Sequence, residues 1–425
     1  MTPLYGFYGD DFTGSTDVLE QLAEGGVPAV LFLRRPDAAL RARFPEARAI
    51  GIAGDARSRS PAWMDAELPA AFAALSEAGI VHYKTCSTSD SSPTVGSIGR
   101  ALDVGIARFG GPAAIVVGAP HLRRYVAFGH LFAAAGEAVY RIDRHPTMAH
   151  HPVTPMTESD LIRHLGHQTD AAIALVSLEA LRGGRANAAF AEAAATHAAV
   201  LFDGMTAEDL AVTGQVLLDR GVRFAAGSSG VTRALVLGWR AAGLIDAAPP
   251  PPRATPVERL LVVSGSCSPV TARQIARAGA EGYATIRADV AALLRGESEE
   301  ENRLATAACA VLQAGGRAVI HSAEGPLGSA AEAAGDRLGA ALGRVAGAAI
   351  RRTGLRRLLF AGGDTSSHGI AQLGIDALTW AAPMEAGAPL VRAHAGDAAI
   401  DGMELVLKGG QIGGEGFFET VRRGG

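Results

Sequence analysis

The sequence contains few cysteines, few aromatic residues and no long apolar run. Its three cysteines, Cys86, Cys267 and Cys309, are far apart and form no CxxC pair, which argues against a disulfide framework or a cysteine zinc site and predicts a reducing compartment. No uninterrupted apolar stretch reaches the roughly 18 residues of a membrane span. Acidic residues already occur at Asp10 and Asp11, where a signal sequence would be apolar. We therefore expect a soluble cytoplasmic protein.

The chain also lacks a strong charge of either sign. Its formal net charge is −4 and it has no long basic stretch, so neither nucleic acid nor a membrane surface is an expected partner. Apolar residues make up 48% of the chain and charged residues 19%, as in a folded enzyme. With 425 residues, the chain is long enough for two or three domains of about 150 residues each.

A proline-rich segment divides the chain in two. Four consecutive prolines, Pro249 to Pro252, can neither continue a helix nor lie in a central strand. We expect a first domain over residues 1–245, a linker over 246–257 and a second domain over 258–425. Each half opens with a short apolar strand, a polar turn with glycine and a helical pattern.

Short apolar segments alternate with helical patterns in both halves. This alternation predicts an α/β fold with largely parallel, helix-flanked sheets. After the opening strand, the expected strands include residues 29–33, 49–53, 80–84, 113–120, 172–177, 200–204, 223–230, 317–322 and 357–363. Ligands of such sheets bind beyond the carboxyl ends of the strands, and the polar clusters of this sequence follow those ends.

The first polar cluster is GDDFTGSTD at residues 9–17. Asp10 and Asp11 directly follow a strand, where two carboxylates can orient substrate hydroxyls, hold a metal ion or accept a proton. Asp, Ser and Thr are also the preferred N-cap residues of helices, so a capping role remains open. Asp17 is expected to be structural.

The second cluster is YKTCSTSDSSPTVGSIG at residues 83–99. Lys84 ends a strand and can neutralise a carboxylate or phosphate as a point charge. The hydroxyl-rich loop that follows, with Ser87 and Asp90, leads to a helix start that can bind an anion. Cys86 has no base assigned to it and is expected to be a packed residue, not a nucleophile.

The loop ARSRS at residues 56–60 follows another expected strand. Arg57 and Arg59 are candidates for a bidentate contact with a carboxylate. A solvated side chain is the default expectation for either arginine.

Five histidines lie in the segment from residue 118 to 156. Their spacings match no standard zinc-ligand set. We expect a histidine- and proline-rich loop that closes over a polar substrate, with TESDL at 157–161 as the start of a helix. The histidines are His121, His130, His145, His150 and His151.

The second half carries glycine-containing turns after strands. These are SGSCSPVT (264–271), LLFAGGDTSSHG (358–369) and LVLKGGQIGGEGFFE (405–419). Glycine lets backbone N–H groups approach a phosphate closely. Neither a Walker A sequence nor GxGxxG after an N-terminal strand occurs, but three such turns in one half predict a nucleotide site.

Taken together, these segments resemble the four-carbon acid sugar kinase family, whose members include 3-oxo-tetronate kinases and threonate or erythronate kinases. The resemblance covers nearly the whole chain. The segments that carry it are DDFTGSTD, YKTCSTSDSSPTVGSIG, GHLF, HHPVTPMTESDL, SGSCSPVT, GGDTS and LKGGQIGG.

The resemblance implies an N-terminal substrate domain and a C-terminal nucleotide domain, both α/β, with the active site in the cleft between them. It implies transfer of the γ-phosphoryl group of ATP to a terminal hydroxyl of a sugar acid, with Mg²⁺ bridging the phosphates. We expect no metal-ligating side chain. The implied substrate contacts are Asp10, Asp11, Arg57, Lys84, Ser87 and Asp90, with Asp10 or Asp11 as the catalytic group that orients or deprotonates the acceptor hydroxyl. The implied ATP contacts are Ser266, Gly362, Gly363, Asp364, Thr365 and Gly410.

Two departures from the family pattern bear on substrate and nucleotide contacts. The chain has SHG at 367–369 where many relatives have SGA, which puts His368 close in sequence to the expected phosphate loop. The segment GAPHLRRYVAFGHLF at 118–132 lacks the NGRTVYQG motif that is common in the family, so a branched acid such as 3-oxo-isoapionate is an alternative substrate.

Two other functions remain alternatives at this stage. One is a nicotinamide-dependent sugar-acid dehydrogenase, which the missing GxGxxG disfavours. The other is a non-catalytic protein that binds nucleotide without transferring phosphate. A homodimer is the assembly that we consider, because dimers are common among enzymes of this size.

Overall fold

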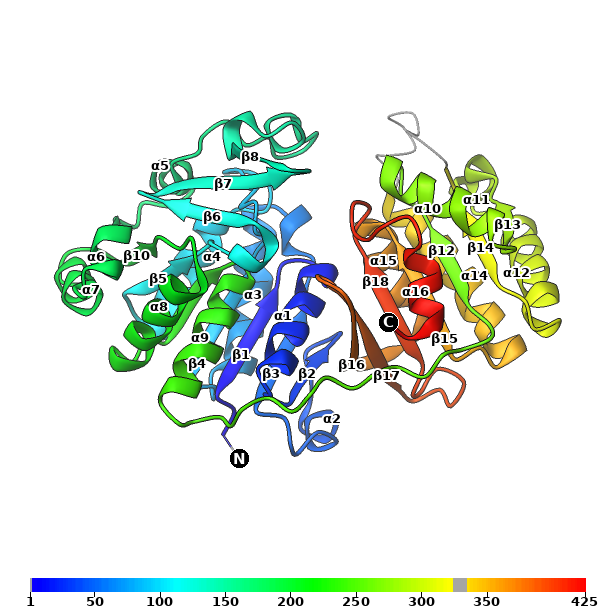
Figure 1. Cartoon of the computed structure of the whole chain (residues 1–425), viewed down its shortest axis with the longest axis horizontal. Helices are drawn as coiled ribbons and strands as arrows, with labels where there is room; N and C mark the ends of the chain where they lie inside the picture. Colours follow the sequence, from blue (N-terminus) through cyan, green and yellow to red (C-terminus); the bar gives the residue numbers. More distant parts are fainter. Residues whose placement is uncertain (1, 324–334) are drawn as a thin grey trace. The chain divides into compact units, whose positions relative to one another are not determined.

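The computed structural model describes residues 2–323 and 335–425 (Figure 1). The chain divides into two compact units. The N-terminal unit comprises Met1–Val30 with Arg35–Pro249, and the C-terminal unit comprises Leu31–Arg34 with Pro250–Gly425. Both contain a helix-flanked sheet, so the predicted α/β class is confirmed.

The sheet of the N-terminal unit is parallel, in the order β3-β1-β4-β11-β5-β10-β9. Its strands are buried along most of their length because helices cover both faces. Their bounds are β1 (Tyr5–Gly9), β3 (Ala49–Ala53), β4 (Ile80–Lys84), β5 (Ala113–Val116), β9 (Ile173–Val176), β10 (Ala199–Phe202) and β11 (Phe224–Gly227), and β2 spans Ala29–Phe32.

The expected strands are present, but several end earlier than predicted. The segment 113–120 leaves the sheet after Val116, 223–230 after Gly227 and 357–363 after Ala361. In each case the residues that follow form the loop or helix start at the carboxyl end of the strand, so the polar clusters lie where ligands of parallel sheets bind.

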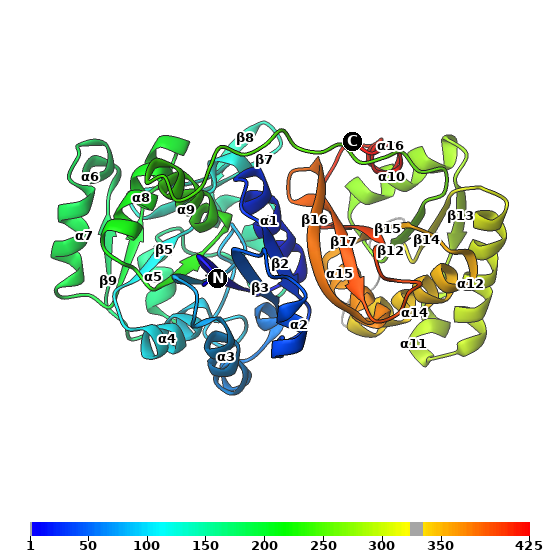
Figure 2. The same ribbon diagram turned by 90° about the horizontal axis from the view of Figure 1, so that it is seen from below.

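Helices flank the N-terminal sheet in two layers (Figure 2). Helices α1, α8 and α9 pack against one another on one side, and α3 and α4 pack together on the other. The helices are α1 (Phe12–Glu24), α2 (Ala38–Ala42), α3 (Pro61–Leu75), α4 (Ile98–Phe109), α5 (Leu161–Gly166), α6 (Leu178–Arg182), α7 (Ala186–Ala194), α8 (Ala207–Asp219) and α9 (Ser229–Ala241), with 3-10 turns η1 (Ala56–Ser58), η2 (Pro120–Leu122), η3 (Ile142–Arg144) and η4 (Met148–His150).

The expected histidine-rich loop is largely a small antiparallel sheet, so that prediction is wrong for residues 124–141. Strands β6 (Arg124–Ala127), β7 (His130–Ala135) and β8 (Ala138–Arg141) pair in sequence order. The buried carboxylate of Asp203 fixes the turn between β6 and β7, because it accepts the N–H groups of Phe128 and Gly129 over 2.8 and 2.9 Å. A long-range carboxylate of this kind is not visible in the local pattern of apolar residues.

The C-terminal unit contains a parallel sheet in the order β13-β14-β12-β15-β18, which the antiparallel strands β17 and β16 extend. The β16–β17 hairpin was not among the expected strands. The bounds are β12 (Leu261–Ser264), β13 (Ala284–Arg287), β14 (Ala318–His321), β15 (Arg357–Ala361), β16 (Ile375–Glu385), β17 (Ala388–Ala395) and β18 (Glu404–Lys408).

Helices α10 and α16 cover one face of this sheet, and α11, α12, α14 and α15 lie on the other (Figure 2). Their bounds are α10 (Pro269–Ala280), α11 (Val290–Arg295), α12 (Ser298–Gln313), α14 (Gly335–Thr353), α15 (Gly363–Ile370) and α16 (Phe417–Arg423), with η5 at Ala371–Leu373. The core under α10 and α16 contains Val262, Leu359, Leu390 and Phe418.

Membrane insertion by a helix finds no support in the part of the chain that the structure describes: none of its helices combines the length and apolarity that crossing a bilayer requires.

Candidate functional site

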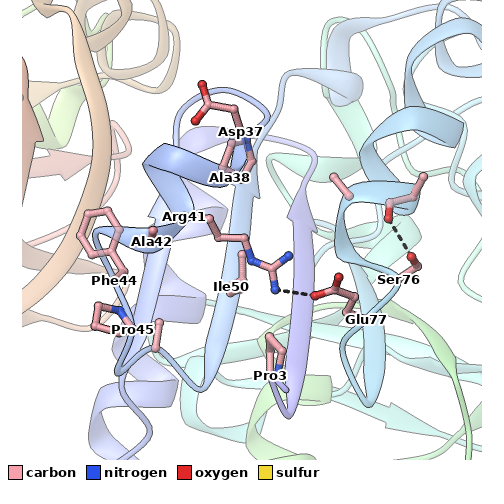
Figure 3. A pocket seen from close by; sticks show the side chains of 14 residues that line it. Pro3, Asp37, Ala38, Arg41, Ala42, Phe44, Pro45, Ile50, Ser76 and Glu77 are labelled. Atoms are coloured by element: carbon pink, nitrogen blue, oxygen red, sulfur yellow. Dashed lines mark hydrogen bonds and ion pairs between the residues drawn. The ribbon is translucent and has the colours of Figure 1, made fainter. Parts of the chain in front are cut away.

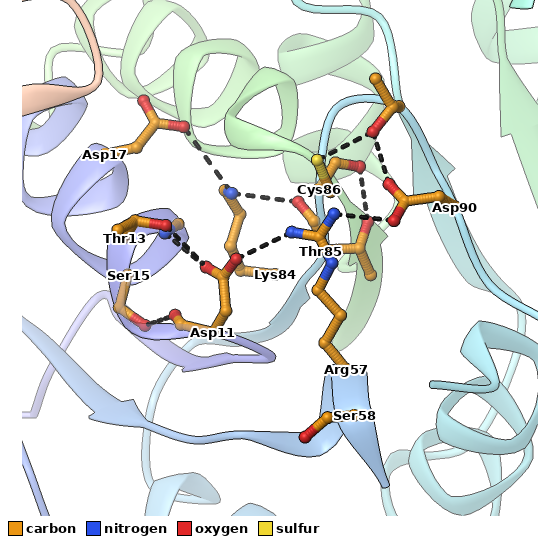
Figure 4. Close-up of polar contacts among 12 residues, drawn as sticks. Asp11, Thr13, Ser15, Asp17, Arg57, Ser58, Lys84, Thr85, Cys86 and Asp90 are labelled. Carbon is orange, nitrogen blue, oxygen red and sulfur yellow. Dashed lines mark hydrogen bonds and ion pairs between the residues drawn. The ribbon is translucent and has the colours of Figure 1, made fainter. Parts of the chain in front are cut away.

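In the N-terminal unit, predicted site residues gather at the carboxyl ends of neighbouring strands. Gly9, the last residue of β1, pairs in register with Lys84, the last residue of β4. Asp10 and Asp11 therefore leave the sheet beside Lys84, and the N–H of Asp10 donates to the carbonyl of Lys84 over 2.9 Å. The turn η1, which follows β3, brings Arg57 to Asp11 and Lys84 (Figure 4). The parallel register thus assembles one polar cluster from three separate segments of sequence.

Arg57 bridges two carboxylates in this cluster. Its Nη1 donates to Oδ2 of Asp11 over 2.8 Å, and its Nη2 donates to Oδ2 of Asp90 over 2.7 Å (Figure 4). The Asp90 side chain is fully buried, and it also accepts hydroxyl hydrogens from Thr88 and Thr154. Burial raises the pKa of Asp90, but Arg57 and Thr88 outweigh that effect and hold the pKa below its usual value. Asp90 is therefore an ionised anchor that orients Arg57.

Asp11 combines the two roles that the sequence left open. As the N-cap of α1, its Oδ1 accepts the N–H of Gly14 over 2.5 Å. Its other carboxylate oxygen accepts from Arg57. Both oxygens of Asp11 are thus engaged, one by the helix and one by the guanidinium.

Asp10 differs from Asp11 in its hydrogen bonding and in its pKa. Its side chain is buried, and its Oδ1 has no hydrogen-bond partner among the described residues. The pKa of Asp10 is raised to about 8, chiefly by burial and then by the charge of Asp11, while Arg57 and Lys84 act in the opposite direction. A carboxyl group that titrates near neutral pH is suited to proton transfer.

Lys84 lies beside these carboxylates and is also buried. Its Nζ donates to the carbonyl of Thr85 over 3.0 Å and lies 3.7 Å from Oδ2 of Asp17 (Figure 4). Asp17 therefore has the structural role expected of it, as the counter-ion of Lys84. A Cβ on Gly14 would lie 2.6 Å from Oδ1 of Asp11 and 2.9 Å from the ammonium nitrogen of Lys84, so a larger residue there would displace the ends of these two side chains.

The remaining predicted residues of this cluster lie around Arg57. Ser87 is half-buried in the loop after β4, and Cys86 contacts Thr88 at 2.9 Å. Arg59 instead forms an exposed ion pair with Asp55, which matches the default expectation of a solvated arginine. Thr154 is a contact of Asp90 that the sequence did not indicate, because it comes from a distant loop.

The histidines of the segment 118–156 have separate partners. His121 contacts Ser229 at 3.2 Å, and His130 contacts Ser159 at 3.0 Å. His145 accepts backbone N–H groups of the turn that follows it, and so does His151. Within residues 2–323 and 335–425, no group of three His, Cys, Asp or Glu side chains is placed to hold a metal ion.

In the C-terminal unit, the glycine-containing turns converge. A Cβ on Gly362 would lie 3.2 Å from the backbone nitrogen of Ser266 and 3.1 Å from Oγ1 of Thr365. A Cβ on Gly410 would lie 2.7 Å from Oγ of Ser266. Four of the residues predicted to bind nucleotide thus lie together at the ends of β12, β15 and β18, and their glycines leave no room for a side chain.

The start of α15 completes this cluster. Gly362, with φ of 116°, is its N-cap, and no side chain caps the helix. The first N–H groups of a helix have no partner within the helix, and such groups can bind a phosphate. The side chain of Asp364 lies outside the described part of the structure. His368 is in the last turn of α15, at the opposite end of the helix from Gly363.

Lys408 and Thr271 join the same cluster although the sequence patterns did not single them out. Nζ of Lys408 donates to Oγ1 of Thr271 over 3.0 Å, and that hydroxyl donates to the carbonyl of Gly410 over 2.8 Å. The N–H of Gly362 donates to the carbonyl of Lys408 over 2.9 Å. Lys408 thus connects two of the glycine-containing turns.

A surface pocket of about 570 Å³ lies elsewhere in the N-terminal unit (Figure 3). Its lining includes Pro3, Arg41, Ala47 and Glu77, and the ion pair between Arg41 and Glu77 spans 3.0 Å. Pro3 and Ala47 precede β1 and β3, so the pocket is at the amino ends of the strands. None of the predicted site residues lines it.

Comparison with known proteins finds two family models that match consecutive parts of the chain. Residues 5–235 match the family model of a sugar-binding N-terminal domain, and residues 261–418 match that of a nucleotide-binding C-terminal domain. The chain is 46% identical to the 3-oxo-isoapionate kinase of Paraburkholderia graminis, over 99% of this chain and 94% of that protein.

The chain belongs to the four-carbon acid sugar kinase family. Two further relatives are the 3-oxo-tetronate kinases of Methylobacterium radiotolerans and Cupriavidus necator. The first is 32% identical over 98% of both chains, and the second is 31% identical over 99% of this chain and 97% of the relative. Membership in the four-carbon acid sugar kinase family confirms the resemblance. It also confirms that the predicted enzyme class is a kinase and not a dehydrogenase.

Solved structures of similar proteins support the fold. A Salmonella typhimurium protein has a TM-score of 0.80 and 26% identity, over 100% of this chain and 99% of that chain. A Haemophilus influenzae protein has a TM-score of 0.73 and 24% identity, over 98% and 99%. The fold of this chain is thus shared over nearly its whole length by two solved proteins.

Proposed function

We propose that this protein is an ATP-dependent kinase that phosphorylates a terminal hydroxyl of a small 3-oxo sugar acid, with branched 3-oxo-isoapionate as the first candidate substrate. The observation that carries the choice of acid is the 46% identity to a 3-oxo-isoapionate kinase, against 32% and 31% to 3-oxo-tetronate kinases. Residues 118–132 depart from the usual sequence motif of the family, and this difference supports the same choice of substrate. A four-carbon 3-oxo-tetronate is the second candidate.

In this proposal the acid binds at the polar cluster of the N-terminal unit. Arg57 and Lys84 hold its carboxylate, because a guanidinium fork and a compact ammonium group both suit that anion. Arg57 is already oriented by Asp11 and Asp90, so it does not have to be ordered when the acid binds. Ser87, half-buried in the same loop region, contributes a hydroxyl for the substrate.

Asp10 is the proposed general base. Its unpartnered Oδ1 and its raised pKa distinguish it from Asp11, both of whose oxygens are engaged. Asp10 takes the proton of the acceptor hydroxyl as the oxygen bonds to the γ-phosphorus. The bond between that phosphorus and the β–γ bridging oxygen breaks, and ADP leaves with the bond's electron pair.

ATP is proposed to bind at the glycine-containing turns of the C-terminal unit. Backbone N–H groups of Gly362, Gly363, Asp364 and Thr365, together with Ser266 and Gly410, suit the phosphates. Mg²⁺ normally keeps several waters and binds through phosphates and one or two carboxylates, so in this proposal it would enter the site with the nucleotide. When bound, Mg²⁺ neutralises charge that develops on the phosphates.

A coupled ADP-release assay tests the proposal. It is run with ATP and Mg²⁺ on 3-oxo-isoapionate, 3-oxo-tetronate and threonate, with the acid omitted as the control. We expect acid-dependent ADP release with the highest kcat/KM on 3-oxo-isoapionate. A higher kcat/KM on 3-oxo-tetronate would reverse the order of the two acids. ATP binding without ADP release on any acid would favour the non-catalytic alternative.

A further inference from the structure

Lysine is almost absent from this chain. Of its 39 Lys and Arg residues, only Lys84 and Lys408 are lysine. Both are the last residue of a parallel strand, β4 in one unit and β18 in the other, and both are buried, with 3% and 0% of their surface exposed. All other Lys or Arg positions of the chain are arginine, so the compact ammonium group occurs only at these two.

Burial alone does not account for lysine at position 408. Arg357, on the neighbouring strand β15, is also 0% exposed. Its guanidinium donates to the carboxylate of Glu404 and to backbone carbonyls of Thr255 and Val421, so its charge and its N–H groups have partners. A fully buried cation in this unit can therefore be an arginine where acceptors surround it.

The surroundings of Lys408 are different. The hydrogen bond of its Nζ to Oγ1 of Thr271 is a bond to a neutral group. Among the described side chains, no carboxylate lies within ion-pair distance of this ammonium group. Burial of a cation without a counter-charge is costly, and here burial lowers the pKa of Lys408 to about 8.

The charged groups on neighbouring elements are engaged elsewhere. On α10, Arg273 and Arg277 pair with Glu415 and Glu281. On β15 and β17, Arg357 and Arg392 both face Glu404. On α15, His368 lies in the last turn, and the side chain of Asp364 is outside the described part.

We infer that Lys408 is a positioning residue of the nucleotide site, whose ammonium group holds the Gly410 turn through Thr271 and whose charge offsets that of the bound phosphates. The inference rests on the proposed nucleotide site. The geometry that carries it is the chain of contacts from Lys408 through Thr271 to Gly410, together with the bond from Gly362 N–H to the carbonyl of Lys408. These contacts link the buried charge to the Gly362 and Gly410 turns.

A consequence is that nucleotide binding takes up a proton. Near pH 8, part of the unliganded protein has a neutral Lys408. An anion bound above it favours the charged form. Proton uptake on ADP binding is therefore expected near pH 8 to 9, and it falls towards zero near pH 6, where Lys408 is already protonated.

Titration calorimetry with ADP and Mg²⁺ tests the inference without any sugar acid. Lys408→Met is expected to weaken ADP binding roughly tenfold or more, the scale of losing one contact to a charged group. Lys408→Arg is also expected to bind ADP weakly, because the larger guanidinium lacks hydrogen-bond acceptors at this position. Arg59→Met, which removes a cation from an exposed ion pair of the other unit, leaves ADP affinity unchanged.

Titrations at pH 8.5 in two buffers of different ionisation enthalpy measure the proton taken up. Wild-type protein shows uptake and Lys408→Met does not. Equal ADP affinity and equal uptake in both proteins would overturn the inference. If Lys408→Met does not fold, the variants Thr271→Ser and Thr271→Val are compared instead. Thr271→Ser keeps the hydroxyl and should retain ADP affinity, and Thr271→Val should lose it. Equal ADP affinities of these two variants would overturn the positioning role. A protein that binds ADP through Lys408 but phosphorylates no acid would refute the proposed function and not this inference.

Discussion

Arg57 donates from Nη1 to Oδ2 of Asp11 over 2.8 Å, while Oδ1 of the adjacent Asp10 has no hydrogen-bond partner in the described part of the chain. The register of β1 with β3 and β4 produces this difference, because Asp11 turns into α1 as its cap and Asp10 remains buried at the strand end. Two neighbouring aspartates thus have separate tasks: Asp11 orients the arginine, and Asp10 is free to take up a proton.

Replacing Asp10 by Asn is expected to lower kcat by at least about a hundredfold, the low end of the loss of a general base. Asp11→Asn is the matched comparison. It removes a charge from the Arg57 bridge, so it should raise the KM for the acid more than it lowers kcat. Steady-state kinetics with saturating ATP measure both. A kcat for Asp10→Asn close to that of the wild type would assign the base elsewhere.

The pH dependence of the reaction should report the same carboxyl group. Because burial raises the pKa of Asp10 to about 8, Asp10 is mostly protonated at pH 6 and cannot accept a proton there. We expect kcat/KM to rise with pH up to about 8 and then level off. Asp10→Asn should lose this rise in its residual activity. A profile that is flat from pH 6 to 9 in the wild type would contradict the assignment.

Asp10 should also destabilise the folded protein at neutral pH. Its pKa is about 8 when folded against an ordinary 3.8, so between these values the folded state binds a proton that the unfolded state does not. Stability therefore falls as pH rises through this window and stops falling above about pH 8. Asp10→Asn removes this contribution, so its Tm at pH 7.5 should exceed that of the wild type by a few degrees. Thermal unfolding followed by circular dichroism measures the difference; a lower Tm at pH 7.5 would mean that the buried carboxylate stabilises the fold.

Arg57 should be sensitive to a change that preserves its charge. Arg57→Lys cannot donate to Asp11 and Asp90 at once, so the KM for the acid should rise at least tenfold, the equivalent of about 1.4 kcal/mol. Loss of a partner for the buried Asp90 should cost about 1–3 kcal/mol of stability, less than for a fully buried pair because Arg57 is 29% exposed. Arg59→Lys is the control: its exposed pair with Asp55 contributes about 0–1 kcal/mol. Denaturant unfolding and kinetics of both variants test this, and equal effects of the two changes would refute the bridging role.

The sequence predicts the parallel sheets and their polar ends well, because strand length, apolar content and glycine position are local properties. The convergence of Ser266, Gly362 and Gly410 follows once the strands pair. The Arg57 bridge depends on register across three strands, and the turn held by Asp203 depends on residues 74 and 75 positions away. The domain bounds, the individual site residues, a homodimer and a cytoplasmic location stay predictions.

The most direct test of the central claim is the ³¹P NMR spectrum of a reaction containing the protein, ATP, Mg²⁺ and 3-oxo-isoapionate. The account predicts a new phosphate-monoester signal that splits through coupling to a CH₂ group, as for a terminal hydroxyl, together with the signals of ADP. Asp10→Asn should give that signal far more slowly. Release of inorganic phosphate alone, or an unchanged ATP spectrum with every 3-oxo acid tested, would contradict it.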